Sequence, residues 1–168
     1  MNTRRAGATD VPAIHGLIAE YAAQGLLLPR SKQEIRARLE HFLVLVERGR
    51  VIGCVALEPY GGALAEIRSL AVDSVIRGRG LGARLVQSAL ALARRRGIAR
   101  VFAVTHAPEF FLGQGFELST RHALPEKIGR DCCACPKAPA CQLVAVVATV
   151  CETRAALPIL PTQPAATP

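Results

Sequence analysis

Apolar residues recur along the chain either at helical spacing or in short continuous runs, and the two patterns predict different elements. A first helix begins at Thr9 or Asp10, carries apolar residues at helical spacing and ends at Gly25. Ser31 and Glu34 have the spacing of a capping box, which predicts a second helix. Two later helices are predicted at 81–96, ended by Gly97, and at 108–114, ended by Gly115. Apolar runs predict strands at 42–47, 51–57, 64–72, 99–105 and 142–150.

The order of these elements predicts an α/β (α+β) fold. The strands 42–47 and 51–57 form a hairpin through Arg48-Gly49, a third strand follows, and helix 81–96 then leads into a further strand. We expect a mixed, mostly antiparallel central sheet with helices on both faces. Residues 1–151 form one domain in this prediction, and 152–168, rich in Ala and Pro, form a disordered tail.

Composition and charge narrow the class of protein. The chain has 168 residues, enough for one well-packed domain, and a formal net charge of +8. The basic residues lie mostly on helix faces without interleaved aromatics, and there is no Trp, which argues against a nucleic-acid partner. No apolar run reaches the ~18 residues of a membrane span, and residues 1–5 show no secretory segment. We therefore expect a soluble cytoplasmic protein.

A glycine-rich turn stands between an apolar strand and a helix, and it carries the strongest functional signal. It reads Arg77-Gly78-Arg79-Gly80-Leu81-Gly82. Backbone N–H groups in such a turn, together with the positive end of the helix dipole, form a cradle for a pyrophosphate. The two arginines add charged donors beside it. The spacing is too compact for a dinucleotide-binding fingerprint and lacks the ending of a nucleoside-triphosphate loop. The alternative is a turn that only caps a core helix.

This turn resembles the R-x-x-G-x-G/A signature of the GNAT acetyltransferases. The resemblance implies acetyl-coenzyme A as the acetyl donor, with its pyrophosphate on the turn and its pantetheine arm along the preceding strand. The cofactor-binding residues implied are Leu70, Ala71, Val72, Arg77, Gly78, Arg79, Gly80, Leu81, Gly82 and Phe111. The segments 25–30, 66–72, 109–116 and 123–125 resemble a narrower group, the acetyltransferase domain of N-acetylglutamate synthase.

The strand 64–72 carries the candidate catalytic groups. Glu66 and Arg68 share one face, whereas the apolar alternation breaks down at 70–72, which suits a β-bulge. The resemblance places the acetyl carbonyl there, so that an N–H of Leu70 or Ala71 would polarise it. The alternative is a strand covered on both faces.

Glu66 is the candidate base that takes a proton from the acceptor ammonium, directly or through water. It could instead only pair with Arg68, and Glu109 is a weaker alternative base. Many family members use a tyrosine of the later helix as the general acid. Here Phe110 and Phe111 occupy that region, so no acid is assigned.

Arginines are the candidate acceptor-binding groups, because guanidinium pairs with carboxylate in a bidentate manner. The resemblance gives Arg30 the α-carboxylate of the acceptor, and Arg68 projects beside Glu66. The predicted substrate-binding set is Arg30, Arg68, Ser69 and Thr105. Lys127 and Arg130 are expected to be solvated surface charges.

Four cysteines precede the last strand. Cys132-x-x-Cys135 has metal-ligand spacing, and Cys141 could be a third ligand for zinc or an iron–sulfur group. No second pair or nearby histidine completes such a site, so we expect unpaired thiols and no metal, with a redox switch as a further alternative. Cys54 is expected in the core.

The predicted function is transfer of acetyl from acetyl-coenzyme A to the α-amino group of an amino acid. The resemblance implies L-glutamate as the acceptor, and hence a role in arginine biosynthesis. The alternatives are a GNAT enzyme for another amine, such as a protein N-terminus, a polyamine or a drug, and a non-catalytic acyl-coenzyme A sensor with a metal or redox loop. The expected partners are these small molecules and a second copy in a homodimer, with no nucleic acid and no membrane.

Overall fold

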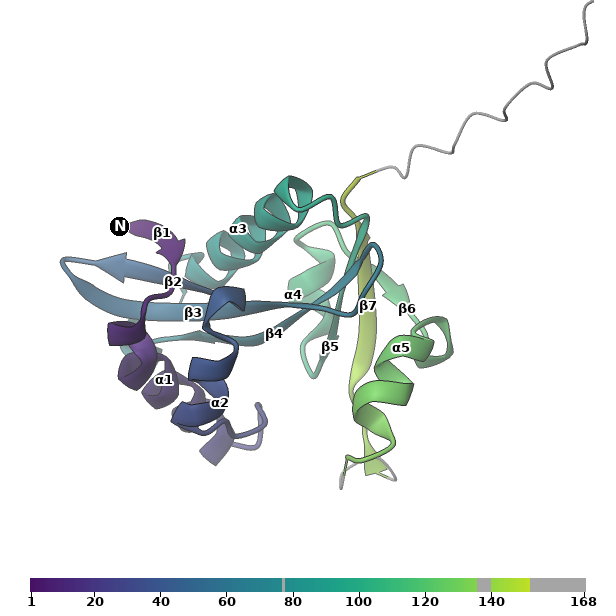
Figure 1. Ribbon diagram of the computed structural model, residues 1–168, viewed down its shortest axis with the longest axis horizontal. Helices are drawn as coiled ribbons and strands as arrows, with labels where there is room; N and C mark the ends of the chain where they lie inside the picture. The colour runs from purple at the N-terminus through teal and green to yellow at the C-terminus, as the bar shows by residue number, and fades with distance from the viewer. Residues whose placement is uncertain (77, 136–139, 152–168) are drawn as a thin grey trace, which may run out of the picture.

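The computed structural model describes residues 1–76, 78–135 and 140–151, which build a seven-stranded mixed sheet with helices on both faces (Figure 1). The strand order is β1-β2-β3-β4-β5-β7-β6, and every neighbouring pair is antiparallel except β4 with β5. The strands are β1 (Asn2–Arg5), β2 (Phe42–Glu47), β3 (Arg50–Pro59), β4 (Leu64–Val72), β5 (Arg100–Thr105), β6 (Glu117–Ser119) and β7 (Val144–Thr149). The helices are α1 (Val11–Ala23), α2 (Lys32–Ala37), α3 (Leu81–Arg95), α4 (Pro108–Leu112) and α5 (Pro125–Lys127).

The fold class predicted from the pattern is confirmed, and so are the long elements. Ser31 and Glu34 make the capping box at the start of α2: the Ser31 hydroxyl accepts from the Glu34 N–H at 3.1 Å, and the Glu34 carboxylate accepts from the Ser31 N–H at 2.7 Å. Two strands were missed, β1 and β6. Strand β1 has the sequence NTRR, which carries no apolar alternation, and it exists through its pairing with β2. The predicted tail at 152–168 lies outside the described residues.

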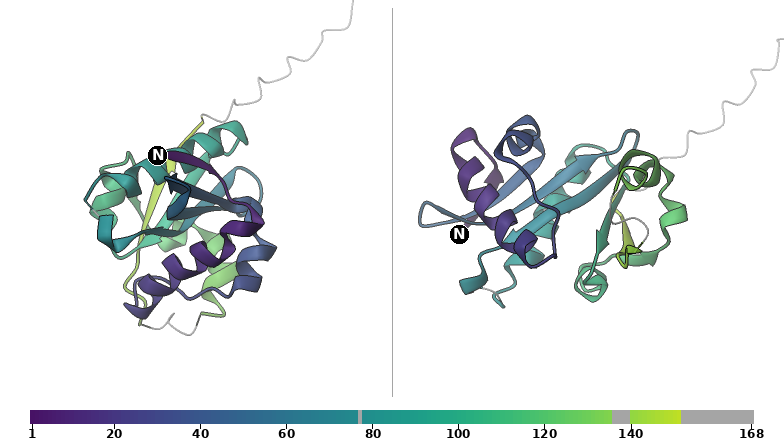
Figure 2. Two further views of the ribbon diagram at one scale, coloured as in Figure 1. Left: turned by 90° about the vertical axis from the view of Figure 1, so that its left-hand side faces the viewer. Right: turned by 90° about the horizontal axis from the view of Figure 1, so that it is seen from below.

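The helices divide the core into separate layers on the two faces of the sheet. Helices α3 and α4 pack on one face and bury the largest cluster, which includes Leu85, Val101 and Phe111. Helices α1 and α2 cover one end of the other face, over a cluster that includes Ile14, Ile35 and Val44. At the far end of that face α5 and the π-helical turn η5 (Ile128–Cys132) stand apart from α1 and α2 (Figures 1 and 2). This division leaves the middle of the face to the functional site.

The parallel strands β4 and β5 pair over only part of their length. The register runs Leu64 with Arg100, Ala65 with Val101 and Glu66 with Phe102, whereas β4 continues to Val72 and β5 to Thr105. Beyond Glu66 the two strands therefore diverge (Figure 1). The diverging edge of β4 is open to an extended ligand, which can bind to it as an added strand would.

The β-bulge expected near the end of β4 is confirmed. Arg68 pairs with Ala56 and Ala71 with Cys54, so two residues of β4, Ser69 and Leu70, lie opposite one residue of β3. Ser69 has φ of +52°, in the left-handed region that non-glycine residues rarely adopt. The hydroxyl of Tyr21 on α1 donates to the carbonyl of Val72 at 2.7 Å and holds the strand just beyond the bulge.

Within the described ranges no helix has the length and apolar character needed to cross a membrane.

The strained φ of Ser69 gives a direct test of the bulge. Ser69→Val should lower the free energy of unfolding by about 2 kcal/mol, because a β-branched residue is strongly disfavoured at positive φ. Ser69→Gly should stay within about 0.5 kcal/mol of the wild type, since relief of the strain offsets the greater freedom of glycine in the unfolded chain. Urea denaturation measures both. Equal stability of the Val and Gly variants would contradict the bulge.

Candidate functional site

The glycine-rich turn forms the N-terminus of α3, as an anion site requires. Gly80 is the residue that caps the helix and has φ of +69°, and Gly78 has φ of +81°. The first N–H groups of this 15-residue helix have no partner within the helix, and the positive end of its dipole points out of the turn. The Phe110 ring lies against Gly82, where an added Cβ would come within 3.4 Å of it. Arg77 lies outside the described residues, and Arg79 is half-exposed, 3.7 Å from Glu47.

The other residues assigned to the cofactor divide between strand and core. Leu70 is partly buried and Ala71 is buried, on the bulged end of β4 that leads toward the glycine turn. The ring of Phe111 is 5% exposed and packs edge-on against Phe110 and Phe116, with centroids 5.1 and 5.2 Å apart. Phe110 rather than Phe111 is therefore the ring next to the turn.

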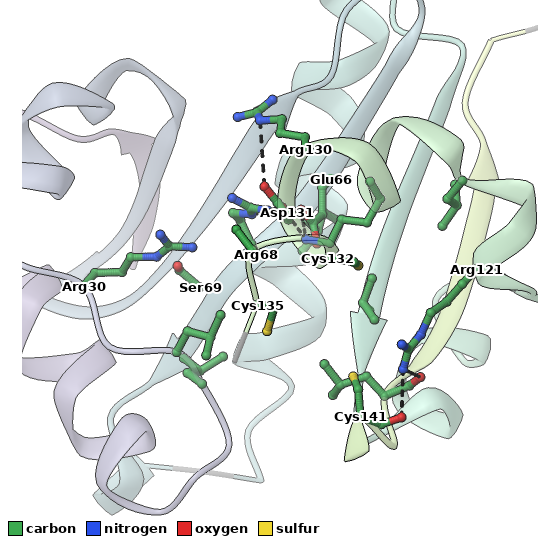
Figure 3. A pocket seen from close by; sticks show the side chains of 18 of the residues that line it. Arg30, Glu66, Arg68, Ser69, Arg121, Arg130, Asp131, Cys132, Cys135 and Cys141 are labelled. Atoms are coloured by element: carbon green, nitrogen blue, oxygen red, sulfur yellow. Dashed lines mark hydrogen bonds and ion pairs between the residues drawn. The ribbon is translucent and has the colours of Figure 1, made fainter. Parts of the chain in front are cut away.

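A cleft of about 680 Å³ opens on the sheet face between α1–α2 and α5–η5 (Figure 3). Glu66, Arg68 and Ser69 of β4 form part of its floor, and Arg30 approaches from the loop before α2. Four residues expected at the acceptor site are thus brought together. Thr105 is not one of the lining residues: its hydroxyl accepts from the N–H of Ala107 at 3.0 Å, whereas its neighbours Val104 and His106 line the cleft.

The charges that line the cleft are predominantly positive. Its basic side chains are Arg30, Arg38, Arg68, Arg121, Lys127 and Arg130, and its carboxylates are Glu34, Glu66 and Asp131. Arg30 pairs with Glu34 at 3.7 Å, and its side chain is 29% exposed. A carboxylate ligand would therefore meet an excess of cationic donors here.

Glu66 is buried at the point where β4 and β5 begin to diverge, and its carboxylate accepts several hydrogen bonds. The donors are the Tyr60 hydroxyl at 2.8 Å, Arg68 Nε at 2.9 Å and Lys127 Nζ at 3.0 Å from Oε2. The pairing with Arg68 that the spacing allowed is present. The network also contains Tyr60. This tyrosine is far from α4 in sequence, but it lies beside Glu66, the predicted base.

A second carboxylate, Asp131 of η5, shares the same donors. Lys127 Nζ lies 2.6 Å from its Oδ2, and Arg68 also donates to it. The Tyr60 hydroxyl contacts both carboxylates and shares its single hydrogen between Glu66 and Asp131. Burial alone would raise the pKa of Asp131, but hydrogen bonds from Lys127 and Tyr60 and the charge of Arg68 hold that pKa well below its usual range. Burial and the neighbouring carboxylates raise the pKa of Tyr60, so this hydroxyl stays protonated and can donate.

Glu58 on β3 collects a further set of cations. Arg38 and Arg130 donate to its carboxylate, and His41 Nδ1 lies 3.0 Å away. Burial would raise the pKa of Glu58, but the hydrogen bonds from His41 and Arg130 and the charge of Arg38 lower it. The Arg130 guanidinium also lies 4.4 Å from the centroid of Tyr60.

The expectation that Lys127 and Arg130 are solvated surface charges is wrong. Their side chains are 15% and 35% exposed, and both line the cleft. The carboxylates that they bind lie on β3 and β4, some 60 to 70 residues earlier in the chain. The local sequence pattern therefore could not predict these contacts.

Three cysteine thiols lie at the edge of the cleft. Cys132, Cys135 and Cys141 line it, and all three are free thiols. Among residues that the structure describes, no three His, Cys, Asp or Glu side chains are grouped to hold a metal ion. Arg121 donates to the carbonyls of Cys141 at 2.9 Å and Leu143 at 3.3 Å. Burial raises the pKa of Cys54 to about 12, which keeps this core thiol protonated.

Comparison with known proteins agrees with the fold and the turn. The model of the acetyltransferase (GNAT) family matches residues 13–116. An uncharacterized N-acetyltransferase from Chlorobaculum tepidum is 40% identical over 147 residues, which are 88% of this chain and 95% of the relative. An amino-acid acetyltransferase from Neisseria meningitidis is 35% identical over 133 residues, 78% of this chain and 30% of the relative.

One solved structure extends the comparison to a bound state. It is N-acetylglutamate synthase from Neisseria gonorrhoeae complexed with coenzyme A and N-acetyl-glutamate, which superposes with a TM-score of 0.81 at 30% identity. The match covers 90% of this chain and 35% of that one. The chain therefore spans about a third of the length of the two Neisseria proteins.

The lowered pKa values of Glu58 and Asp131 predict sensitivity to acid. A carboxyl whose pKa is lower in the folded than in the unfolded chain stabilises the fold above the unfolded value, about 4, and this contribution is lost as the pH falls through the folded value. The free energy of unfolding should therefore decline as the pH drops below about 4.5.

Glu58→Gln should be less stable at pH 7 and should show a shallower acid decline. Urea denaturation at pH 7, 4.5 and 3.5 measures both, with the exposed Glu126→Gln as the matched control. An acid decline in Glu58→Gln as steep as that of the wild type would contradict the assignment.

Proposed function

The chain belongs to the acetyltransferase (GNAT) family and is an acetyl-coenzyme A-dependent N-acetyltransferase; from that premise we propose that its acceptor is the α-amino group of an acidic amino acid, L-glutamate. The product would be N-acetylglutamate, which gives the protein a role in arginine biosynthesis. The amino-acid acetyltransferase among its relatives, and the similarity to N-acetylglutamate synthase bound to N-acetyl-glutamate, support this assignment.

The observation that carries the proposal is the charge of the cleft. Six basic side chains face three carboxylates, so the cleft favours anions. An acidic amino acid presents two carboxylates, and guanidinium groups hold carboxylates through paired hydrogen bonds. A polyamine or a peptide N-terminus without acidic residues would bring positive charge into a positive cleft. The charge of the cleft therefore favours an acidic amino acid over a cationic amine as the acceptor.

Arg30 and the pair Arg68 and Lys127 suit the two acceptor carboxylates. Arg30 enters from the loop before α2 and has a long, exposed ion pair, so in this proposal it takes the α-carboxylate. Arg68 and Lys127 lie across the floor, beside Glu66, and take the side-chain carboxylate. The acceptor amine then lies over β4, the strand that continues through the bulge to the glycine turn.

In this proposal β4 aligns the acceptor with the acetyl donor. With the pyrophosphate on the N–H groups of the turn at 78–82 and the pantetheine arm along the open edge of β4, the thioester reaches the bulge at Ser69–Leu70. In this proposal a backbone N–H at the bulge, that of Leu70 or Ala71, donates to the thioester oxygen. One such donor lowers the barrier by about 3 kcal/mol.

Glu66 accepts the proton of the acceptor ammonium, directly or through a water molecule. The neutral amine then attacks the thioester carbon, and the C–S bond breaks as the C–N bond forms. The coenzyme A thiolate leaves without an assigned acid, because a thiol with a pKa of about 8.5 is a tolerable leaving group near neutral pH. Tyr60 and Lys127 orient the Glu66 carboxylate in this scheme.

The acceptor assignment predicts the outcome of a turnover assay. Purified protein should release coenzyme A thiol from acetyl-coenzyme A when L-glutamate is added, and release with spermidine or an Ala-Lys-Lys peptide should be at least tenfold slower, because the cleft repels cations. Absorbance of a thiol reagent measures release, and mass spectrometry identifies the acetylated product. Turnover with cationic amines alone would reject the acceptor, and acetyl-coenzyme A binding without any turnover would favour the sensor.

The assignment of the base predicts that Glu66→Gln lowers kcat by about a hundredfold or more, since general base catalysis contributes on that order. The KM for acetyl-coenzyme A should stay within about threefold, because Glu66 contributes no donor to the cofactor turn. The matched control is Glu109→Gln, which removes the exposed alternative base on α4 and should leave kcat unchanged. The reverse pattern would assign the base to Glu109, and thermal denaturation of both variants excludes unfolding as the cause.

A further inference from the structure

Asp131 occupies the place in the cleft that suits a ligand carboxylate. Its carboxylate accepts from Arg68, from the Tyr60 hydroxyl and from Lys127 Nζ at 2.6 Å, and its side chain is 28% exposed to the cleft (Figure 3). Two cations and a hydroxyl converge on Oδ2, and Arg130 Nε lies 3.9 Å from Oδ1, which together form a donor set for carboxylate recognition. Here the chain itself supplies the carboxylate.

The two carboxylates of this network differ in how firmly the fold holds them. Glu66 stands on β4 between two paired strands, and its side chain is 4% exposed. Asp131 stands on the π-helical turn η5, in which no residue is buried. The neighbouring α5 also contains no buried residue. The nearest buried anchor of this segment is Leu124, which precedes α5, so the contacts of Asp131 itself are polar, whereas Glu66 cannot move without disturbing the sheet.

Asp131 neutralises positive charge that an incoming acceptor carboxylate would otherwise meet. Arg68 and Lys127 carry two positive charges, and Glu66 and Asp131 together balance them. With Asp131 in place this pair of cations has no net attraction for a further carboxylate. When Asp131 withdraws, one positive charge and several directed donors become available together.

We propose that Asp131 is a specificity-determining residue: an internal carboxylate that fills the side-chain subsite formed by Arg68, Lys127 and Tyr60, and that a dicarboxylate acceptor displaces. This inference rests on the proposed function and deepens it, because it names the subsite and the acceptor chemistry that opens it. A monocarboxylate amino acid held by Arg30 alone leaves Asp131 in place. An acceptor with a second carboxylate replaces it and couples its own binding to release of the η5 turn from the sheet.

Removal of the Asp131 charge tests the inference. Asp131→Asn keeps the size of the side chain and removes its charge. It should bind glutarate, a dicarboxylate with no amine to acetylate, at least about fivefold more tightly than the wild type, because no internal carboxylate then competes for Arg68 and Lys127. Isothermal titration measures this binding without turnover. Asp131→Ser, which also removes the carboxylate, should shift the affinity in the same direction and guards against a folding defect in one variant.

Kinetics give a second readout that a merely structural role would not produce. The KM for L-glutamate should fall about fivefold in Asp131→Asn, whereas the KM for L-glutamine, whose side chain is neutral, should change by less than about twofold. The matched control is Glu126→Gln, an equal change of charge at an exposed position of α5 that does not line the cleft. It should leave the binding of glutarate unchanged.

The outcomes separate this inference from the function on which it rests. Unchanged or weaker binding of glutarate in both Asp131 variants overturns it, since Asp131 would then only fasten the segment. An equal gain in Glu126→Gln also overturns it, because the effect would reflect net charge. Tighter binding of glutarate without acetylation of glutamate would keep the subsite and reject the proposed function. Acetylation of glutamate with unchanged glutarate binding would reject the subsite alone.

Discussion

The divergence of β4 from β5 is the constraint on which the rest of the site depends. The two parallel strands pair through Glu66 and Phe102 and then separate, while β4 runs on through its bulge to Val72. Three parts of the proposed site follow one another along this strand: the proposed acceptor-binding side chains at Glu66–Ser69, the irregular backbone at Ser69–Leu70, and the turn that starts α3 beyond it. Tyr21 from α1 holds the end of the strand, so the geometry is fixed by packing.

Charged contacts fasten one wall of the cleft. Helices α3 and α4 bury a continuous core on the opposite face, whereas α5 and η5, beyond the buried Leu124, contact the sheet through Lys127, Arg130 and Asp131. A segment fastened by polar contacts can be moved by a ligand that offers equivalent contacts, which an apolar interface does not allow.

The sequence predicted the features whose interacting residues lie close together in the chain. The capping box of Ser31 and Glu34, the bulge near Leu70 and the turn before α3 are local, so residue type and spacing were enough. Tyr60, Lys127, Arg130 and Asp131 could not be found in this way. Their partners lie up to 72 residues away, and only the pairing of β3 with β4 and the return of the chain over the sheet bring them together. Strand β1 was missed for the same reason: its own sequence has no strand pattern, and it forms by pairing with β2, about 40 residues later in the chain.

The central claim is that one strand aligns an acidic acceptor with acetyl-coenzyme A across the bulge, and a crystal structure of the ternary complex with coenzyme A and L-glutamate tests it most directly. The pyrophosphate should lie on the N–H groups of the turn at 78–82, and the amine of glutamate should lie over the bulge. The glutamate carboxylates should lie at Arg30 and at Arg68 with Lys127. Glutamate bound outside this cleft, or coenzyme A bound away from β4, would contradict the account.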